Sequence, residues 1–196
     1  MVTVSILFFF ALYGATVYGI DITTVGIDVA KKIAETNDVD KSCFFSVQNA
    51  SNMNFPDEKF DIVIMHEVLH HAIKYPGVKQ EIMRVLKKGG TFIAAESIRD
   101  NPLIKIGTFF TMRGLEEKGD VALSISNLKD FSAGFSSYEI ELFSLLFMSK
   151  RIFRDYMDFF LVRWFLYFTK KVDDLLLDFL PALKKYCLEV ILVAKK

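Results

Sequence analysis

The feature that most constrains this chain is an alternation, over its first half, of short apolar runs with segments whose apolar residues recur at helical spacing. Each run has the length of one strand, and its hydrophobicity is continuous rather than alternating. That pattern is typical of strands buried on both faces of a parallel sheet. The runs are Ala15 to Ile20, Cys43 to Val47, Phe60 to Met65 and Thr91 to Ala95. The alternation predicts an α/β fold with a doubly wound, mostly parallel sheet.

Three helices are expected between these runs. The first covers Val4 to Tyr13 and turns at Gly14 into the first run, so that helix and strand are both buried. The second is capped by Thr23 or Thr24 and ends near Asn37. The third is stopped by the pair Gly89-Gly90. The apolar faces of the second and third helices consist of Ile27, Ala30, Ile33 and Ala34, and of Val78, Ile82, Val85 and Leu86.

The segment Met1 to Ile20 contains no charged residue, which is also typical of a signal peptide or a membrane span. A secretory signal has a basic beginning, which this segment lacks. Gly14 and Gly19 interrupt the stretch just before Asp21. These features favour a buried helix followed by a buried strand.

The second half has a different pattern. Residues 97 to 135 are mixed and rich in loops, Tyr138 to Phe143 alternates like a strand, and Tyr186 to Ala194 predicts a final strand. A helical insertion at about 145–182 includes the aromatic region Lys150 to Leu180, whose polar stripe is Arg151, Arg154, Asp155 and Asp158. We expect one domain over 1–196, with a cofactor-binding half at 1–96 and a substrate or cover half at 97–196.

Composition excludes several classes of function. The 24 basic and 24 acidic residues balance, and no basic run suggests a nucleic-acid partner. The two cysteines, Cys43 and Cys187, form no metal-binding or disulfide pattern, which favours a cytoplasmic protein. Glu67 lies at helical spacing from His70 and His71, but a third distant ligand is lacking, so no metal site is predicted.

Three motifs occur in a fixed order. An acid, Asp21, ends an apolar run; Asn54-Phe55-Pro56-Asp57 precedes Phe60 to Ile64 and then Glu67-Val68-Leu69-His70-His71; and Arg84-Val85-Leu86-Lys87-Lys88-Gly89-Gly90 follows. Over roughly residues 11 to 96 this series resembles the class I S-adenosylmethionine-dependent methyltransferases, particularly the type 11-like members. The resemblance implies a Rossmann-like fold, S-adenosyl-L-methionine as cofactor, and methyl transfer to a small-molecule or a lipid- or glycan-linked acceptor.

The resemblance also assigns roles to residues at the carboxyl ends of the predicted strands, where ligands of open α/β sheets bind. Asp21 matches the acid that accepts the ribose hydroxyls, and Asn49 stands where the family usually has an acid for the adenine amine. An amide oxygen accepts the same hydrogen bond without charge assistance. The cofactor-binding residues predicted in this way are Asp21, Ile22, Asn49, Ala50, Met65 and His66.

Proton transfer and acceptor binding have fewer candidates. His70 and His71 are the clustered residues that could deprotonate an acceptor, although many methyltransferases act by positioning alone. Glu96 and Arg99 follow the predicted fifth family strand, where acceptors are usually met, and are the expected substrate residues. The aromatic helical region suggests a bulky or lipid-like acceptor, or otherwise a simple cover for the sheet.

The sequence departs from the family at its beginning, because the central first strand and the glycine-rich loop have no matching residues. We therefore expect an N-terminally truncated methyltransferase in which two strands keep open edges, unless Met1 to Leu7 forms a makeshift strand. An inactive methyltransferase-like module that contacts a membrane or a protein is the alternative. An NAD-dependent oxidoreductase shares the strand-end acid but not the other motifs.

Overall fold

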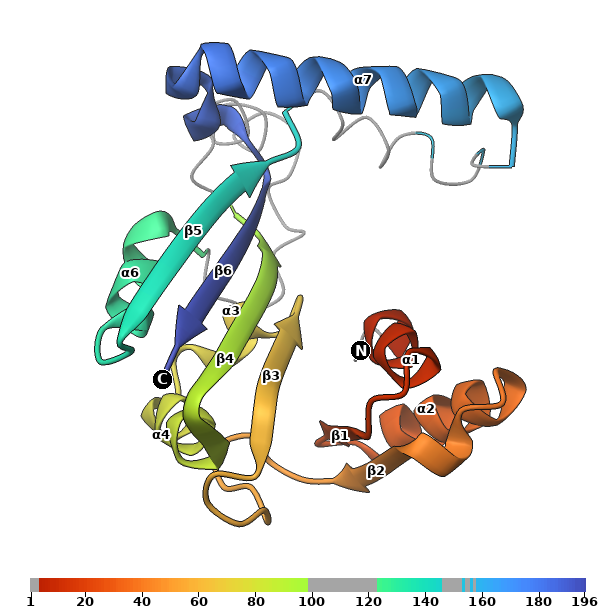
Figure 1. Ribbon diagram of the computed structural model, residues 1–196, viewed down its shortest axis with the longest axis vertical. Coiled ribbons are helices and arrows are strands. Elements are labelled where there is room, and N and C mark those ends of the chain that lie inside the picture. Colours follow the sequence, from red (N-terminus) through yellow and green to blue (C-terminus); the bar gives the residue numbers. More distant parts are fainter. Residues whose placement is uncertain (1–3, 99–122, 146–152, 154–155, 157) are drawn as a thin grey trace, which may run out of the picture. The chain divides into compact units, whose positions relative to one another are not determined.

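The computed structural model describes residues 4–98, 123–145, 153, 156 and 158–196, and its helices and strands alternate along the first half of the chain (Figure 1). The elements are α1 (Val4–Leu12), β1 (Val17–Asp21), α2 (Thr24–Thr36), η1 (Asp40–Ser42), β2 (Cys43–Val47), β3 (Phe60–His66), α3 (Leu69–Ala72), α4 (Pro76–Val85), β4 (Leu86–Ser97), α6 (Ile125–Ser132), β5 (Ser137–Phe143), α7 (Phe160–Phe179), η4 (Pro181–Tyr186) and β6 (Glu189–Lys195).

The strands form two sheets rather than one. β1 and β2 make a two-stranded sheet, and the second sheet has the order β3-β4-β6-β5. β1 pairs with β2 in parallel, from Val17 opposite Cys43 to Asp21 opposite Val47. The chain divides into a first compact unit, residues 1–93 with 195–196, and a second compact unit, residues 94–194. The α/β class and the Rossmann-like, mostly parallel arrangement agree with the prediction.

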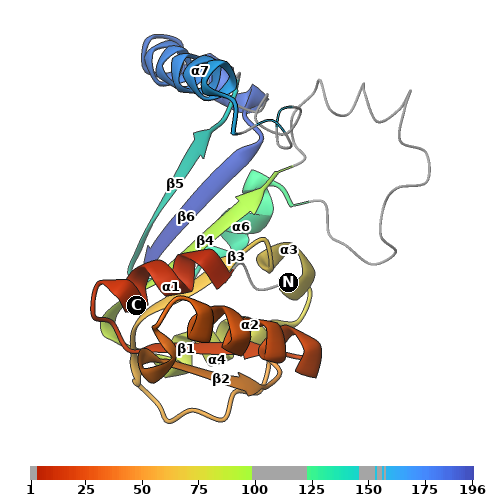
Figure 2. The same cartoon turned by 90° about the vertical axis from the view of Figure 1, so that its right-hand side faces the viewer.

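Helices α1 and α2 lie on the same side of the β1–β2 sheet (Figure 2). The α2 helix begins where the sequence predicted, because the side chain of Thr23 accepts a hydrogen bond from the backbone N–H of Gly26, and its C-cap is Asn37. Between α1 and β1 the chain turns at Gly14, whose φ of 87° favours glycine. These elements share a core of Phe8, Ala11, Val17, Ala34, Val39 and Cys43.

The expectation that α1 and β1 would be buried all round is wrong. Phe9, Leu12 and Tyr13 are exposed, with 56% of Phe9 accessible to solvent, while Phe8 and Ala11 are buried. Tyr18 of β1 is also partly exposed. A helix that packs on a sheet of only two strands has one covered side, so its apolar residues on the other side stay in contact with water. Moreover, residues 4–7 are helical, so these residues do not form a makeshift strand.

The predicted stop of α4 at Gly89-Gly90 is also wrong. The helix ends at Val85, because Leu86 already has extended backbone with ψ of 136° and begins β4. Gly89 has a φ of 73°, and its N–H donates to the carbonyl of Lys196. The glycine pair therefore lies inside the strand, at the point where it pairs with the last residue of the chain. The predicted apolar positions Val78, Ile82, Val85 and Leu86 are all buried.

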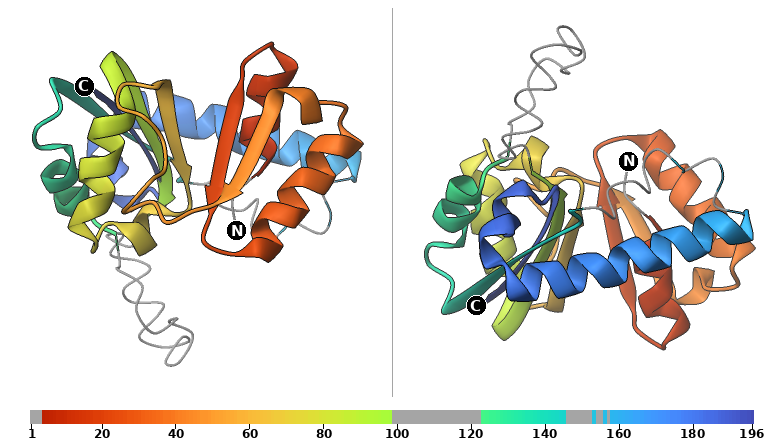
Figure 3. Two further views of the ribbon diagram at one scale, coloured as in Figure 1. Left: turned by 90° about the horizontal axis from the view of Figure 1, so that it is seen from below. Right: turned by 90° about the horizontal axis from the view of Figure 1, so that it is seen from above.

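In the second unit, β5 begins one residue earlier than predicted, and β6 begins three residues later than predicted, after η4. Helix α6 lies within residues 97–135, which were predicted to be mixed and rich in loops. The Ser124 side chain accepts from the Asn127 N–H, and the Asn127 side chain accepts from the Ser124 N–H. The long helix α7 begins at Phe160, so Asp158 precedes it; Arg151, Arg154 and Asp155 lie outside the described residues. α7 continues unbroken to Phe179 (Figure 3).

None of the helices in the described part of the chain combines the length and the apolar character that crossing a bilayer requires.

Candidate functional site

Asp21 lies at the carboxyl end of β1, directly before the N-cap of α2. Its Oδ1 accepts hydrogen bonds from the N–H of Thr23 at 2.8 Å and from the Thr23 hydroxyl at 2.7 Å. A side chain at Gly26 would place its Cβ 2.8 Å from the Asp21 carboxyl carbon, so glycine allows the helix to approach this closely. Within the described residues Oδ2 accepts no hydrogen bond, which leaves one carboxylate oxygen available to a ligand.

The end of β2 lies beside the end of β1, since the N–H of Gln48 donates to the carbonyl of Asp21 at 2.9 Å. Asn49 follows, and its exposed side chain is engaged locally. Its Oδ1 accepts from the N–H of Ser51 at 2.9 Å and from the Ser51 hydroxyl at 2.8 Å. Both lone pairs of the amide oxygen are thus used. The predicted contact with an adenine amine requires the Ser51 hydroxyl to turn away.

The carboxyl end of β3 carries the other predicted residues of the first unit. Met65 is buried and His66 is half-buried, and the chain then bends at Glu67, whose φ of 51° is unusual for a residue with a side chain. The short helix α3 follows, fixed by the fully buried Leu69. The rings of His70 and His71 lie against each other with centroids 4.0 Å apart.

Glu96 and Arg99 are the predicted substrate residues. Glu96 belongs to the second unit, where it is 2% exposed near the end of β4. Arg99 lies outside the described residues.

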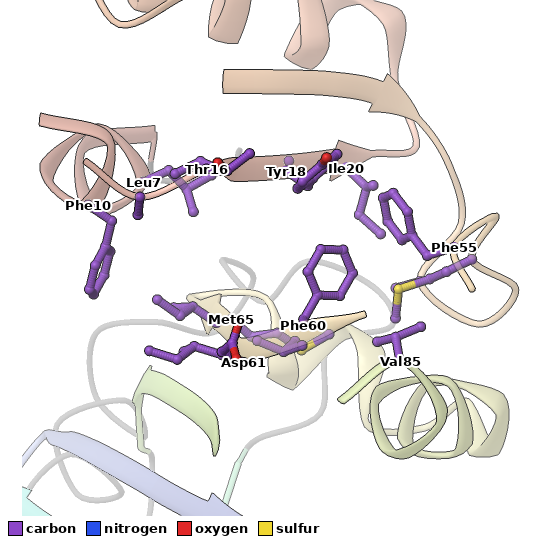
Figure 4. Close-up of a pocket in the computed structure, with 18 of the residues that line it drawn as sticks. Leu7, Phe10, Thr16, Tyr18, Ile20, Phe55, Phe60, Asp61, Met65 and Val85 are labelled. Carbon is purple, nitrogen blue, oxygen red and sulfur yellow. The ribbon is translucent and has the colours of Figure 1, made fainter. Parts of the chain in front are cut away.

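A cavity of about 500 Å³ opens in the first unit between β1 and β3 (Figure 4). It contains three of the predicted cofactor residues, Ala50, Met65 and His66, in its lining. Asp21, Ile22 and Asn49 do not line it. Asp21 directly follows the lining residue Ile20, Asn49 directly precedes the lining residue Ala50, and Ile22 is two residues beyond Ile20. The structure therefore places the six predicted residues at one end of the strands and only half of them on the cavity.

The remaining lining is mostly apolar and aromatic, and sequence reasoning did not identify it as part of a site. Tyr18, Phe55 and Phe60 form a group of rings, with centroids 5.6 Å apart for Tyr18 and Phe60 and 5.0 Å for Phe55 and Phe60. The ammonium group of Lys59 lies 3.7 Å from the centre of the Tyr18 ring. In the sequence, the aromatic residues near the predicted turn at Pro56 could have indicated this aromatic part of the cavity lining.

Arg84 fixes the loop that leads to β3. Its guanidinium group donates to the carbonyls of Phe55 at 2.7 Å and Met53 at 2.9 Å, and it pairs with Asp57 and Glu81. Hydrogen bonds to Glu81 and then to Asp57 raise the pKa of Arg84 above its ordinary value. Arg84 was noticed only as part of a motif, yet its contacts explain why that motif and the Asn-Phe-Pro-Asp turn occur together.

Comparisons with known proteins match residues 3–94 to the methyltransferase domain family. A sterol 24-C-methyltransferase of Aspergillus fumigatus is 33% identical over 141 residues, which cover 67% of this chain and 34% of that protein. A demethylmenaquinone methyltransferase of Symbiobacterium thermophilum is 31% identical over 94 residues, covering 47% and 38%. This chain thus spans less than two fifths of the length of these curated relatives.

Solved structures share the fold at low sequence identity. A protein from Pyrococcus horikoshii has a TM-score of 0.63 and 16% identity, covering 96% of this chain and 74% of that one. Phosphoethanolamine N-methyltransferase 2 of Haemonchus contortus, solved with S-adenosyl-L-methionine, has a TM-score of 0.60 and 18% identity, covering 93% and 44%.

Proposed function

Because this chain belongs to the class I S-adenosylmethionine-dependent methyltransferases, we propose that it binds S-adenosyl-L-methionine and takes part in methyl transfer to a small-molecule or lipid-like acceptor. The observation that carries this proposal is the meeting of Asp21, Asn49 and their neighbours at the shared carboxyl end of β1 and β2. Ligands of open α/β sheets bind at this end of the strands. The cofactor, when bound, supplies an electrophilic methyl group on a sulfonium.

The residues of the first unit fit the cofactor in part. Oδ2 of Asp21 can accept from a ribose hydroxyl while Oδ1 keeps its bonds to Thr23, so binding does not disturb the start of α2. Asn49 must exchange its bond to the Ser51 hydroxyl for one to the adenine amine. Ala50, Met65 and His66 offer mostly apolar surface next to these groups.

His70 and His71 remain the candidates for removing a proton from the acceptor. A neutral imidazole nitrogen accepts a proton near neutral pH, and the half-buried His70 is the better shielded of the two. Glu96 and Arg99 remain the proposed acceptor-binding residues. The names of the two relatives give a sterol and demethylmenaquinone as acceptors, which supports a lipid-like acceptor here. The free thiols of Cys43 and Cys187 support a cytoplasmic location.

Asp21→Asn tests the proposed cofactor site with little disturbance of the fold, because an amide oxygen can still accept from Thr23. Loss of a hydrogen bond to a charged acceptor should weaken binding of S-adenosylhomocysteine by about 10- to 100-fold in isothermal titration. Asp28→Asn, at an exposed position of α2, is the matched control and should bind like the wild type. Absence of saturable binding by the wild-type chain would contradict the proposal.

A binding module is the second candidate function, favoured by one face of α7. Residues Leu166, Thr169, Asp173 and Leu177 of this helix are buried. The opposite face exposes Trp164 and Phe168, whose rings stack at 6.0 Å, together with Leu161, Leu175 and Phe179. Arg163, Lys170 and Lys171 are exposed beside these residues. An amphipathic helix of this composition is typical of binding to the surface of a membrane.

Vesicles test this second function directly, because Trp164 is the single tryptophan of the chain. If α7 binds lipid, vesicles of phosphatidylcholine with phosphatidylglycerol should shift the Trp164 emission to shorter wavelength and co-sediment with the protein. Phe168→Asp should abolish both effects. Phe9→Asp, which changes an exposed aromatic residue of α1, should leave them intact. An unshifted emission spectrum at saturating lipid would rule out binding through α7.

A further inference from the structure

Three strands of the first unit, β1, β2 and β3, each lack a neighbour on one side, and two of them, β1 and β3, line the cavity. β1 is a terminal strand of the two-stranded sheet, and β3 is a terminal strand of the four-stranded sheet. A strand without a neighbour presents backbone N–H and C=O groups that template pairing with another chain. Among the described residues, then, the open edges of β1 and β3 lie within one compact unit and border the same cavity.

The cavity of the first unit is bounded by these two edges. Its lining includes every residue of 15–20 and every residue of 60–66 in succession, Gly19 among them. Side chains of a strand alternate between its two faces, so a cavity on a face would be lined by every second residue. Contact with consecutive residues indicates that the cavity runs along the backbone edges of both strands.

The walls above and below the edges are apolar. Leu7 and Phe10 of α1 contribute to the lining on the β1 side, and Val85 of α4 contributes beside β3 (Figure 4). A backbone polar group facing such a wall has few other partners, and leaving it without one is costly. Of the occupants that could fill this space, an extended polypeptide supplies both apolar side chains and backbone hydrogen bonds.

At one end, side chains bridge the space between the strands. The Tyr18 ring of β1 contacts the Phe60 ring of β3 with centroids 5.6 Å apart, and Lys59 lies over Tyr18. An entering strand must displace these rings, so they act as a removable plug. Phe44 of β2 also stacks on Tyr18, at 5.2 Å, but it does not line the cavity.

We propose that the slot between β1 and β3, lined by residues 15–20 and 60–66, binds an extended polypeptide segment that joins the two sheets. The segment should be about as long as β1 and β3, which have 5 and 7 residues, and apolar on both faces. Its backbone forms hydrogen bonds with both edges. A second copy of the chain is a poorer source, because each strand of the described residues is already paired in its own sheet. This binding does not depend on the proposed methyl transfer.

The probe is a fluorescein-labelled peptide with a central run of five valine and isoleucine residues between lysines, mixed with the full chain. Hydrogen exchange followed by mass spectrometry should slow at least tenfold in peptic fragments covering both β1 and β3. The matched control peptide has the same sequence with alternate backbone nitrogens methylated, which keeps its apolar surface but removes donors. It should give no protection.

Variants locate the binding in the slot. Phe60→Ala removes half of the plug and should tighten peptide binding several-fold by fluorescence anisotropy, whereas Phe44→Ala should leave the affinity unchanged. Equal protection by both peptides would show a simple apolar cavity and overturn the proposal. Protection of one sheet alone, no binding of either peptide, or protection that grows with protein concentration without peptide would each overturn it as well.

Discussion

Glu81 of α4 holds together the loop before β3 and the helix after it. Its Oε2 accepts from the Met53 N–H at 2.6 Å, and its Oε1 accepts from Nε of Arg84 at 2.7 Å. The hydrogen bond from Arg84 lowers the pKa of Glu81 below its ordinary value, while partial burial opposes this effect and the Met53 N–H adds to it. The ionised carboxylate is thus the form that the folded state prefers.

The free energy of unfolding should therefore decrease at low pH, because protonation of Glu81 weakens its hydrogen bonds. Its contribution is complete above the ordinary glutamate pKa of the unfolded chain and is lost as the pH falls through the lower folded pKa. Glu81→Gln should unfold at lower urea concentration than the wild type at about pH 7, with the difference shrinking as the pH falls below the ordinary glutamate pKa of about 4.3. Glu35→Gln, at an exposed position of α2, should follow the wild type throughout. A constant difference at all pH values would contradict this explanation.

The two cysteines should be unreactive in the folded chain. The pKa of the Cys187 thiol is raised to about 11, chiefly by burial and then by the nearby Asp173 carboxylate, while Lys184 opposes the increase. Burial and then Asp40 raise the pKa of Cys43. Because the thiolate is the reactive form, Ellman's reagent at about pH 8 should react with neither thiol before denaturation and with both afterwards. Rapid reaction of the native protein would contradict the burial of these groups.

At the residue scale, the sequence predicted where functional groups lie along the strands better than what those groups contact. The position of Asp21 at a strand end follows from the apolar run before it. The bonds from Ser51 that engage Asn49 depend on a local turn, and the contacts of Arg84 with the loop before β3 depend on tertiary packing. Such contacts join residues up to 31 positions apart, and periodicity does not report them.

Helix α7 contains adjacent aspartates in opposite environments. Asp173 is 2% exposed and accepts from the Leu145 N–H at 2.9 Å, whereas the exposed Asp174 pairs with Lys170. Asp173→Ala should lower the free energy of unfolding by about 1–3 kcal/mol, because a backbone donor loses its partner. Asp174→Ala should change it by less than about 0.5 kcal/mol. Urea unfolding of both variants measures the difference, and equal effects would refute it.

Among elements, α2, which has a clear cap, and β2, which is a clear apolar run, were predicted accurately. α2 starts after Thr23, and β2 covers the predicted residues without change. The errors have local causes: α6 has a Ser124–Asn127 capping box in a polar segment, and Gly89-Gly90 resembles a helix stop although Leu86 has already left the helix. Glycine marks a backbone conformation, and its neighbours in space decide which element uses it.

For the whole molecule, the two sheets should differ in stability. A sheet of two strands is marginal by itself, whereas β4 has β3 on one side and β6 on the other. Without added peptide, hydrogen exchange should be slowest for amides of β4 and distinctly faster for amides of β1 and β2. The comparison uses rates corrected for the intrinsic exchange of each sequence. Equal protection in the two sheets would show that they open together.

The α/β class was predictable, because the order of motifs implies which strands should be neighbours. The cavity between β1 and β3 was not, since its shape depends on how Tyr18, Phe60 and the α1 side chains fill the space between these strands. The single domain expected over 1–196 remains a prediction. Order along the chain thus indicates the topology, while side-chain packing decides what the open edges enclose.

The strand order has a consequence for synthesis on the ribosome. β4 ends at Ser97. Its neighbour in the sheet is β6, which also pairs with β5 and begins only at Glu189. At translation rates of about 5–20 residues per second, β4 waits roughly 5–20 s for this partner. During that interval both β4 and β5 emerge with an open side, so the nascent chain is most vulnerable to chaperone capture or aggregation just before β6 emerges.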